Sequence, residues 1–171
     1  MQPKRHALAN QKGGVGKTAT TLGLASAISH RGGRALIVDM DPQANATEGL
    51  GVYTEEGQLT TADLMDRTEP GSAIDAVVAT DWDGIDLIPA HLDLSNAESS
   101  GASDLVFRLD VALEGLDLSP YDAVLFDCPP SLGKLLFAVL LTVDAVYAVT
   151  EPTKDSAKAV TRLETTVQKV K

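Results

Sequence analysis

The glycine-rich segment at residues 12–18, Lys-Gly-Gly-Val-Gly-Lys-Thr, holds the side chains that point most directly to chemistry. Glycines allow successive backbone N–H groups to turn inward and donate to phosphate oxygens. A helix that begins at Lys17 would add the positive end of its dipole. Lys17 would reach the β- and γ-phosphates of a nucleotide, and the Thr18 hydroxyl would bind Mg²⁺. The segment therefore predicts a phosphate-binding loop.

Carboxylates follow two of the apolar segments that we expect to be buried strands. Asp39 and Asp127 end these segments, and Asp41 follows two residues after Asp39. In parallel sheets, ligands bind beyond the carboxyl ends of the strands. The three carboxylates are therefore candidates for the same site as the loop. For Asp39, a helix cap or a hydrogen bond at the strand end is the alternative interpretation.

The loop departs from the common phosphate-binding pattern at its start. Gln11 occupies the position where that pattern has glycine, and Lys12 adds a second lysine. A lysine at this position is useful only if its charge reaches a phosphate. Because Lys17 already serves the nucleotide of its own chain, we expect Lys12 to contact a phosphate in a facing subunit.

Short apolar strands alternate with helices along the chain. We expect strands at 6–10, 34–39, 85–88, 123–127 and 145–149, and helices at 17–31, 61–67, 72–79, 104–116, 132–142 and 154–171. Residues 40–60 are rich in turn formers, and residues 95–103 fit a loop or a weak helix. This alternation predicts an α/β fold of the P-loop NTPase kind, with a mostly parallel sheet and helices on both faces.

Composition limits the classes of protein that remain. A length of 171 residues fits one domain, and a single cysteine, Cys128, excludes an internal disulfide and a cysteine-built metal site. The longest apolar run, at 135–143, is too short to span a bilayer, and the first residues lack the apolar core of a signal peptide. We therefore expect a cytoplasmic protein.

The net charge of −10 is distributed unevenly along the sequence. Residues 1–47 carry +4, residues 48–122 carry −15 and residues 123–171 carry +1. An acidic chain is unsuited to binding nucleic acid over its whole surface. The acidic middle segment is most simply interpreted as a solvated face.

Three segments together resemble one family. Residues 12–18 look like the deviant Walker A motif of the ParA/MinD family of ATPases, residues 38–47 resemble its second motif, and residues 126–131 resemble its Walker B strand. The Asp-Pro-Gln-x-Asn-x-Thr form within 38–47 is closer to the ParA partition ATPases than to MinD. Residues 88–94 and 150–153 also look like ParA. The resemblance covers nearly the whole chain.

The resemblance implies a role for each candidate residue. Lys12 would be the signature lysine that contacts nucleotide across a dimer interface, and Asp41 would position or activate the attacking water. Thr18 would ligate Mg²⁺, while Asp39 and Asp127 would act on the ion through water. The nucleotide would be held by Gly13, Gly14, Val15, Gly16, Lys17, Thr18 and Ala19.

The resemblance also implies cofactors, partners and a cellular role. ATP and Mg²⁺ would be bound, the protein would form a homodimer on ATP binding, and a ParB-type activator would stimulate slow hydrolysis. The role would be plasmid or chromosome segregation, with the protein in the cytoplasm and on the nucleoid. A non-hydrolysing, nucleotide-dependent scaffold and a MinD-like positioning ATPase are the alternatives.

The last expected helix has two faces. Lys154, Lys158, Arg162 and Lys169 form a basic stripe opposite an apolar stripe of Val160, Leu163, Val167 and Val170. The basic stripe fits a solvated face or a contact with DNA phosphates. The apolar stripe lacks the Phe or Trp anchor of a membrane-surface helix, so we expect no membrane binding.

The chain is shorter than ParA-type ATPases usually are. We expect 1–171 to be a single P-loop domain that lacks the C-terminal part usual in the family, with an open sheet edge. A fragment and a naturally short relative fit the sequence equally.

Overall fold

The computed structural model describes residues 2–170, except for the side chains of residues 154–156. Six strands form one sheet in the order β3-β4-β2-β5-β1-β6, in which β3 pairs antiparallel with β4 and every other pair is parallel. The strands are β1 (Lys4–Ala9), β2 (Ala35–Asp39), β3 (Val78–Ala79), β4 (Ile85–Ile88), β5 (Ala123–Asp127) and β6 (Ala145–Ala148).

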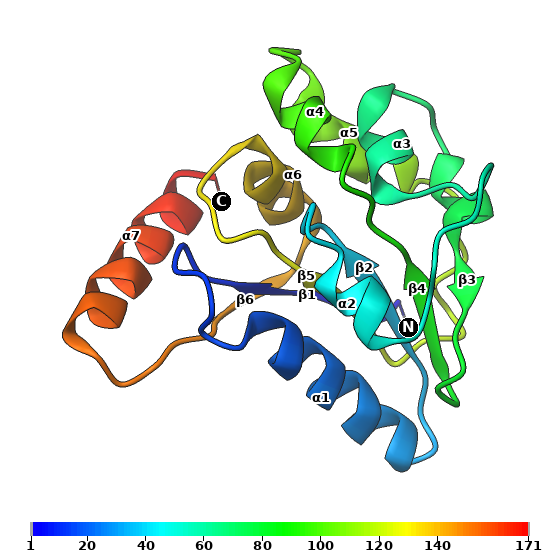
Figure 1. The fold of residues 1–171 in the computed structure, drawn as a ribbon, viewed down its shortest axis with the longest axis horizontal. Helices are drawn as coiled ribbons and strands as arrows, with labels where there is room; N and C mark the ends of the chain where they lie inside the picture. The colour runs from blue at the N-terminus through cyan, green and yellow to red at the C-terminus, as the bar shows by residue number, and fades with distance from the viewer. Residues whose placement is uncertain (1, 171) are drawn as a thin grey trace.

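Helices cover both faces of this sheet (Figure 1). One face packs against α1 and α2, and the other packs against α3, α5, α6 and α7. The helices are α1 (Lys17–His30), α2 (Asn45–Gly49), α3 (Thr61–Asp66), α4 (Leu94–Ser99), α5 (Leu105–Ala112), α6 (Lys134–Thr142) and α7 (Lys154–Val170), with a 3₁₀ helix η1 (Ser72–Ala76). The predicted fold class is confirmed.

Strand β2 shows why the sheet is apolar on both sides. Its alternate residues Ala35 and Ile37 face the layer of α1, while Leu36 and Val38 face the layer of α3 and α5. All four side chains are fully buried. A parallel strand between two helical layers needs such a continuous apolar run, because each face buries its own set of side chains.

The expected strands at 85–88 and 123–127 have the predicted bounds, whereas the expected helix at 72–79 is wrong. That segment divides into η1 and the two-residue strand β3, which pairs with β4 at the sheet edge. Helix α2, of five residues, lies in the segment 40–60 that is rich in turn formers, and helix α4, of six residues, overlaps the segment 95–103 that fitted a loop or a weak helix. Helices this short draw their stability from tertiary contacts rather than from their own sequence.

The carboxyl ends of three parallel strands meet at one edge of the sheet. Asp39 at the end of β2 lies opposite Asp127 at the end of β5, and Asp127 lies opposite Leu8 of β1. The loop after β1 is therefore brought next to both aspartates. In the described part of the chain, no helix is long and apolar enough to cross a membrane.

Candidate nucleotide-binding site

Residues 10–16 form the loop that joins β1 to α1. Gly14 and Gly16 have φ angles of 74° and 91°, in the left-handed region that glycine adopts at little cost. Helix α1 begins directly afterwards with Lys17, which is only 7% exposed. A glycine loop that leads into a fourteen-residue helix is suited to binding phosphate at the helix N-terminus.

Asn10 anchors the start of this loop. Its buried side chain donates from Nδ2 to the carbonyl oxygen of Val149 at 2.7 Å, and its Oδ1 accepts from the backbone N–H of Lys12 at 2.9 Å. These bonds fasten the loop to the end of β6. An amide directly after a buried strand is the only sign of this role in the sequence.

Asp127, the last residue of β5, accepts hydrogen bonds from two threonines of α1. Thr18 Oγ1 donates to its Oδ2 at 2.6 Å, and Thr21 Oγ1 donates to its Oδ1 at 3.2 Å. Burial raises the pKa of Asp127 to about 6, although the two hydroxyls and the charge of Lys17 act in the opposite direction. Thr21 is absent from the predicted site, but its place one helical turn after Thr18 could have suggested it.

Asp39 is fully buried beside Asp127. Burial and the neighbouring charge of Asp127 raise the pKa of Asp39 to about 7. Two adjacent buried carboxylates favour a bound cation, because each raises the free energy of ionising the other. Carboxylate and hydroxyl oxygens are the ligands that Mg²⁺ prefers, so Thr18, Asp127 and Asp39 fit a magnesium ion.

The other ligands of such an ion would come from phosphate and water. Among residues 2–170, apart from the side chains of 154–156, no three His, Cys, Asp or Glu side chains form a group that could hold a metal ion. Mg²⁺ typically keeps several waters and is bound through one or two carboxylates plus substrate phosphates. The arrangement therefore suits an ion that arrives with a nucleotide.

Asp41 lies within the same group of charges. Its backbone N–H donates to Asp39 Oδ1 at 3.1 Å, and its own Oδ1 accepts from the N–H of Gln43 at 3.0 Å. The charge of Asp41 contributes to the raised pKa of Asp127, so the two carboxylates are close. The structure thus brings Lys17, Asp41 and Asp127 together at one edge of the sheet.

Lys12 points to a different partner. Its Nζ forms an ion pair of 2.8 Å with Glu151 Oε2 in the segment after β6, and both side chains are more than two-fifths exposed. Residues 12 and 151 are far apart in the sequence, so the pattern around the loop gives no sign of this contact. An exposed ion pair contributes little to stability. Lys12 can therefore exchange Glu151 for another anion at small cost.

The predicted basic stripe lies on α7. Lys158, Arg162 and Lys169 are exposed, while the opposite face buries Leu163 against the core, with Val167 and Val170 beside it. The side chain of Lys154 lies outside the described residues. The two-faced helix agrees with the sequence pattern, and its basic face lies far along the chain from the phosphate loop.

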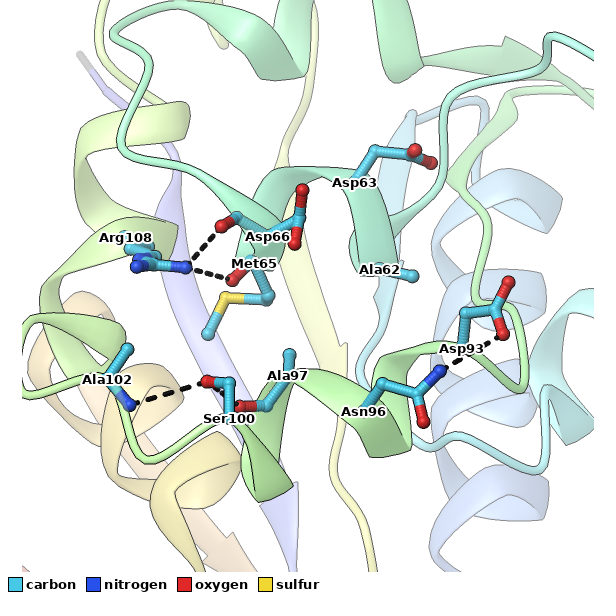
Figure 2. Close-up of a pocket in the computed structure, with 10 residues that line it drawn as sticks. All are labelled: Ala62, Asp63, Met65, Asp66, Asp93, Asn96, Ala97, Ser100, Ala102 and Arg108. Atoms are coloured by element: carbon cyan, nitrogen blue, oxygen red, sulfur yellow. Dashed lines mark hydrogen bonds between the residues drawn. The ribbon is translucent and has the colours of Figure 1, made fainter.

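A pocket of about 520 Å³ lies between α3, α4 and α5 rather than at residues 10–18. Figure 2 shows Arg108 reaching across it, with its guanidinium donating to the carbonyl oxygens of Met65, at 2.9 Å, and of Asp66. Asn96 Nδ2 likewise donates to Asp93 Oδ1, at 3.3 Å. These hydrogen bonds join residues of the pocket walls to one another, so the groups that make them are not free to bind a phosphate. We therefore assign the nucleotide site to the loop and not to this pocket.

A mostly parallel sheet with a glycine loop between one of its parallel strands and the following helix defines a P-loop nucleotide-binding domain. The bond from Thr18 to Asp127 on the neighbouring strand belongs to the same arrangement. A family model described as an AAA domain matches residues 4–171, and the chain belongs to this family, among the ParA-type proteins.

Two curated relatives carry partition names. The chromosome partitioning protein ParA of Caulobacter vibrioides is 38% identical over 168 residues, which are 96% of this chain and 62% of that protein. The chromosome-partitioning ATPase Soj of Thermus thermophilus is 38% identical over 170 residues, which are 98% of this chain and 63% of that protein. The chain thus spans less than two thirds of the length of these relatives.

Solved structures agree with the fold. Cobyrinic acid a,c-diamide synthase from Mycobacterium smegmatis, with a bound ATP analogue and magnesium, has a TM-score of 0.85 and 34% identity, covering 98% of this chain and 68% of that one. A plasmid partition protein from Borrelia burgdorferi has a TM-score of 0.88 and 26% identity, covering 99% and 74%.

Proposed function

We propose that this chain is the nucleotide-binding part of a ParA-type partition ATPase, which binds ATP with Mg²⁺ and hydrolyses it slowly. The observation that carries the proposal is the 2.6 Å bond between Thr18 of the phosphate loop and the buried Asp127. It joins the hydroxyl and the carboxylate that a nucleotide-bound Mg²⁺ requires. The family match, the partition names of its relatives and the magnesium and ATP analogue bound in the M. smegmatis structure support it.

The proposed roles follow from where each side chain lies. Residues 13–19 would wrap the phosphates, Lys17 would neutralise charge on the β- and γ-phosphates, and Thr18 with Asp127 would hold Mg²⁺, with Asp39 acting through water. Mg²⁺ would neutralise the charge that develops on the phosphates. Asp41 would orient the attacking water, and its carboxylate must be ionised to accept a proton from it.

We propose that the protein forms a homodimer when ATP binds, and that Lys12 and the partners act in this dimer. We infer that Lys12 leaves Glu151 and reaches the nucleotide of the facing subunit, where its charge would add to that of Lys17. A ParB-type activator would stimulate hydrolysis, and the basic face of α7 would bind DNA without sequence preference. The cellular role would be segregation of a plasmid or chromosome on the nucleoid.

The direct test replaces Asp41 with alanine. We expect Asp41→Ala to bind ATP with Mg²⁺ as the unchanged protein does, and to hydrolyse it at least about 100-fold more slowly, the usual effect of losing a proton-accepting group. Nucleotide binding is measured with a fluorescent ATP analogue, and phosphate release is measured with and without a ParB-type partner. Asp81→Ala, at an exposed position before β4, is the matched control and should hydrolyse normally.

The outcomes separate the alternatives. Full hydrolysis by Asp41→Ala would remove Asp41 from the mechanism. Nucleotide binding with no hydrolysis by the unchanged protein, even with its partner, would favour the non-hydrolysing scaffold. If the loop is the site, Lys17→Ala should fail to bind nucleotide, while Asp81→Ala should bind it normally.

A further inference from the structure

Asp39 lies at the start of the loop that carries Asp41, and both oxygens of its carboxylate accept hydrogen bonds from that loop. Asp39 Oδ1 accepts from the backbone N–H of Asp41 at 3.1 Å. Its Oδ2 accepts from Thr47 twice, from the backbone N–H at 2.9 Å and from Oγ1 at 2.8 Å. Asp39 thus connects both ends of the segment 41–47.

Thr47 extends these bonds to a third segment. The residue is 2% exposed, and while its hydroxyl donates to Asp39, the same oxygen accepts from the backbone N–H of Ala90 at 3.0 Å. Ala90 follows the end of β4, the strand next to β2. One hydroxyl therefore ties α2 to the ends of two neighbouring strands.

The segment between Asp39 and Thr47 combines a hydrogen-bonded turn with a very short helix. In the turn, the N–H groups of Gln43 and Ala44 donate to Oδ1 and to the carbonyl oxygen of Asp41, at 3.0 and 2.9 Å. Helix α2 has only five residues, and it begins after Ala44, whose φ of 53° lies in the left-handed region that disfavours alanine. An isolated helix of this length is unstable in water. The bonds at Asp39 and Thr47 therefore add to those of the turn in fixing the conformation of residues 40–46.

We propose that Thr47 is a positioning residue, which fixes Asp41 at the phosphate loop by holding the Asp39 carboxylate and α2 in place. The proposal rests on the proposed function, because it assigns Thr47 to the step in which Asp41 takes part. Loss of the Thr47 hydroxyl leaves the Ala90 N–H without its acceptor and removes one of the two donors to Asp39 Oδ2, which favours other arrangements of residues 40–46.

The test compares two changes of the same kind in the intact protein. Thr47→Val keeps the shape of the side chain and removes the hydroxyl. Thr61→Val does the same at a fully buried threonine whose hydroxyl donates at 2.9 Å to the backbone carbonyl oxygen of Asp39, not to its carboxylate. Thr47→Val loses two buried hydrogen bonds, to Asp39 and from Ala90, whereas Thr61→Val loses one, so both should lose stability and Thr47→Val should lose more.

Only Thr47→Val should affect the reaction. We expect its kcat to fall about tenfold or more, with KM for ATP within about threefold of the original value, since Asp41 acts after the nucleotide is bound. Thr47→Ser, which retains the hydroxyl, should recover kcat to within about threefold. Thr61→Val should keep kcat within about threefold as well.

Amide hydrogen exchange supplies a measurement that does not depend on hydrolysis. In the protein without nucleotide, Thr47→Val should accelerate exchange in the peptide that contains residues 40–50 more than Thr61→Val does. Equal exchange in the two variants, or an equal loss of kcat, would overturn the proposal. If the unchanged protein hydrolyses no ATP, the proposed function fails, while the exchange comparison still decides the role of Thr47.

Discussion

At the scale of single residues, the site contains two buried carboxylates on adjacent strands. Asp39 and Asp127 are opposite one another in register, and each has a pKa raised by burial above its usual range. Hydroxyl and amide donors lower the free energy of the ionised forms, but they do not cancel the effect of burial. Without a cation, the pair therefore costs stability at neutral pH, and binding of a cation would remove that cost.

The raised pKa of Asp39 predicts a pH-dependent effect of Asp39→Asn on the protein without ligand. A carboxyl with a higher pKa in the folded state contributes stability at low pH, and this contribution is lost as the pH rises from about 4 to about 7. Asparagine does not titrate. The free energy of unfolding of Asp39→Asn relative to the unchanged protein should therefore increase by about 1 kcal/mol or more between about pH 5 and about pH 8.

Urea denaturation at the two pH values measures this difference. Addition of Mg²⁺ with a nucleotide should reduce it, because a cation favours the ionised form of Asp39. The same relative free energy of unfolding at both pH values would show that Asp39 is ionised throughout.

At the scale of elements, one turn determines how α1 joins the sheet. After α1 the chain reverses at Gly32 and Gly33 and enters β2, where it meets the turn before β4. The N–H of Ala35 donates to the carbonyl oxygen of Gly84 at 2.9 Å, and Gly84 has a φ of 72°. A Cβ on Gly84 would lie 2.8 Å from the carbonyl oxygen of Gly33. The two turns approach so closely that a side chain at Gly84 requires one of them to move.

Gly84→Ala should therefore cost more than the same change at Gly57. Both glycines have a left-handed φ, which costs alanine about 1–2 kcal/mol. Among the described residues, nothing lies within 4 Å of a Cβ on Gly57, so only Gly84→Ala adds a backbone clash. We expect the free energy of unfolding to fall by at least about 1 kcal/mol more in Gly84→Ala than in Gly57→Ala, as measured by denaturant titration.

Equal losses in the two variants would mean that the turns before β2 and β4 separate readily. In that case the contact between these turns would not fix the position of α1 relative to β4.

At the scale of the whole molecule, charge is separated along the chain. The net charge of −10 is concentrated in residues 48–122, which include α3, α4 and α5. The phosphate loop lies in the basic first third, and α7 presents Lys158, Arg162 and Lys169 to solvent. A polyanion would be repelled by most of the surface, so any contact with DNA must be confined to a restricted face.

Charge reversal at Lys158 and Arg162 tests that contact. We expect the double variant Lys158→Glu, Arg162→Glu to bind DNA more weakly in the presence of ATP. The slope of log K against log salt concentration should decrease by about two, because two phosphate contacts are lost. Arg67→Glu, which changes an exposed arginine just after α3, is the control and should leave the slope unchanged. Unchanged DNA binding by the double variant would assign the basic face of α7 to solvent alone.

The sequence by itself determined the parts of this protein that depend on local pattern. Apolar runs identified four of the five predicted strands to within one residue at each end, and the fifth, at 6–10, to within two. Their alternation with helices predicted the parallel sheet, which brings Asp39 and Asp127 to one edge. The glycine loop was evident because its function needs particular residue types at fixed spacing along a continuous segment.

Only the tertiary structure decided the contacts between distant segments. The ion pair between Lys12 and Glu151 and the bond between Thr47 and Ala90 join residues with no local relationship. Helix α2 and strand β3 are too short to produce a periodic pattern, and neighbouring elements stabilise them. Periodicity reports which face of an element is buried, but it carries no information on which distant donor completes a buried carboxylate, because that depends on how the strands and loops pack.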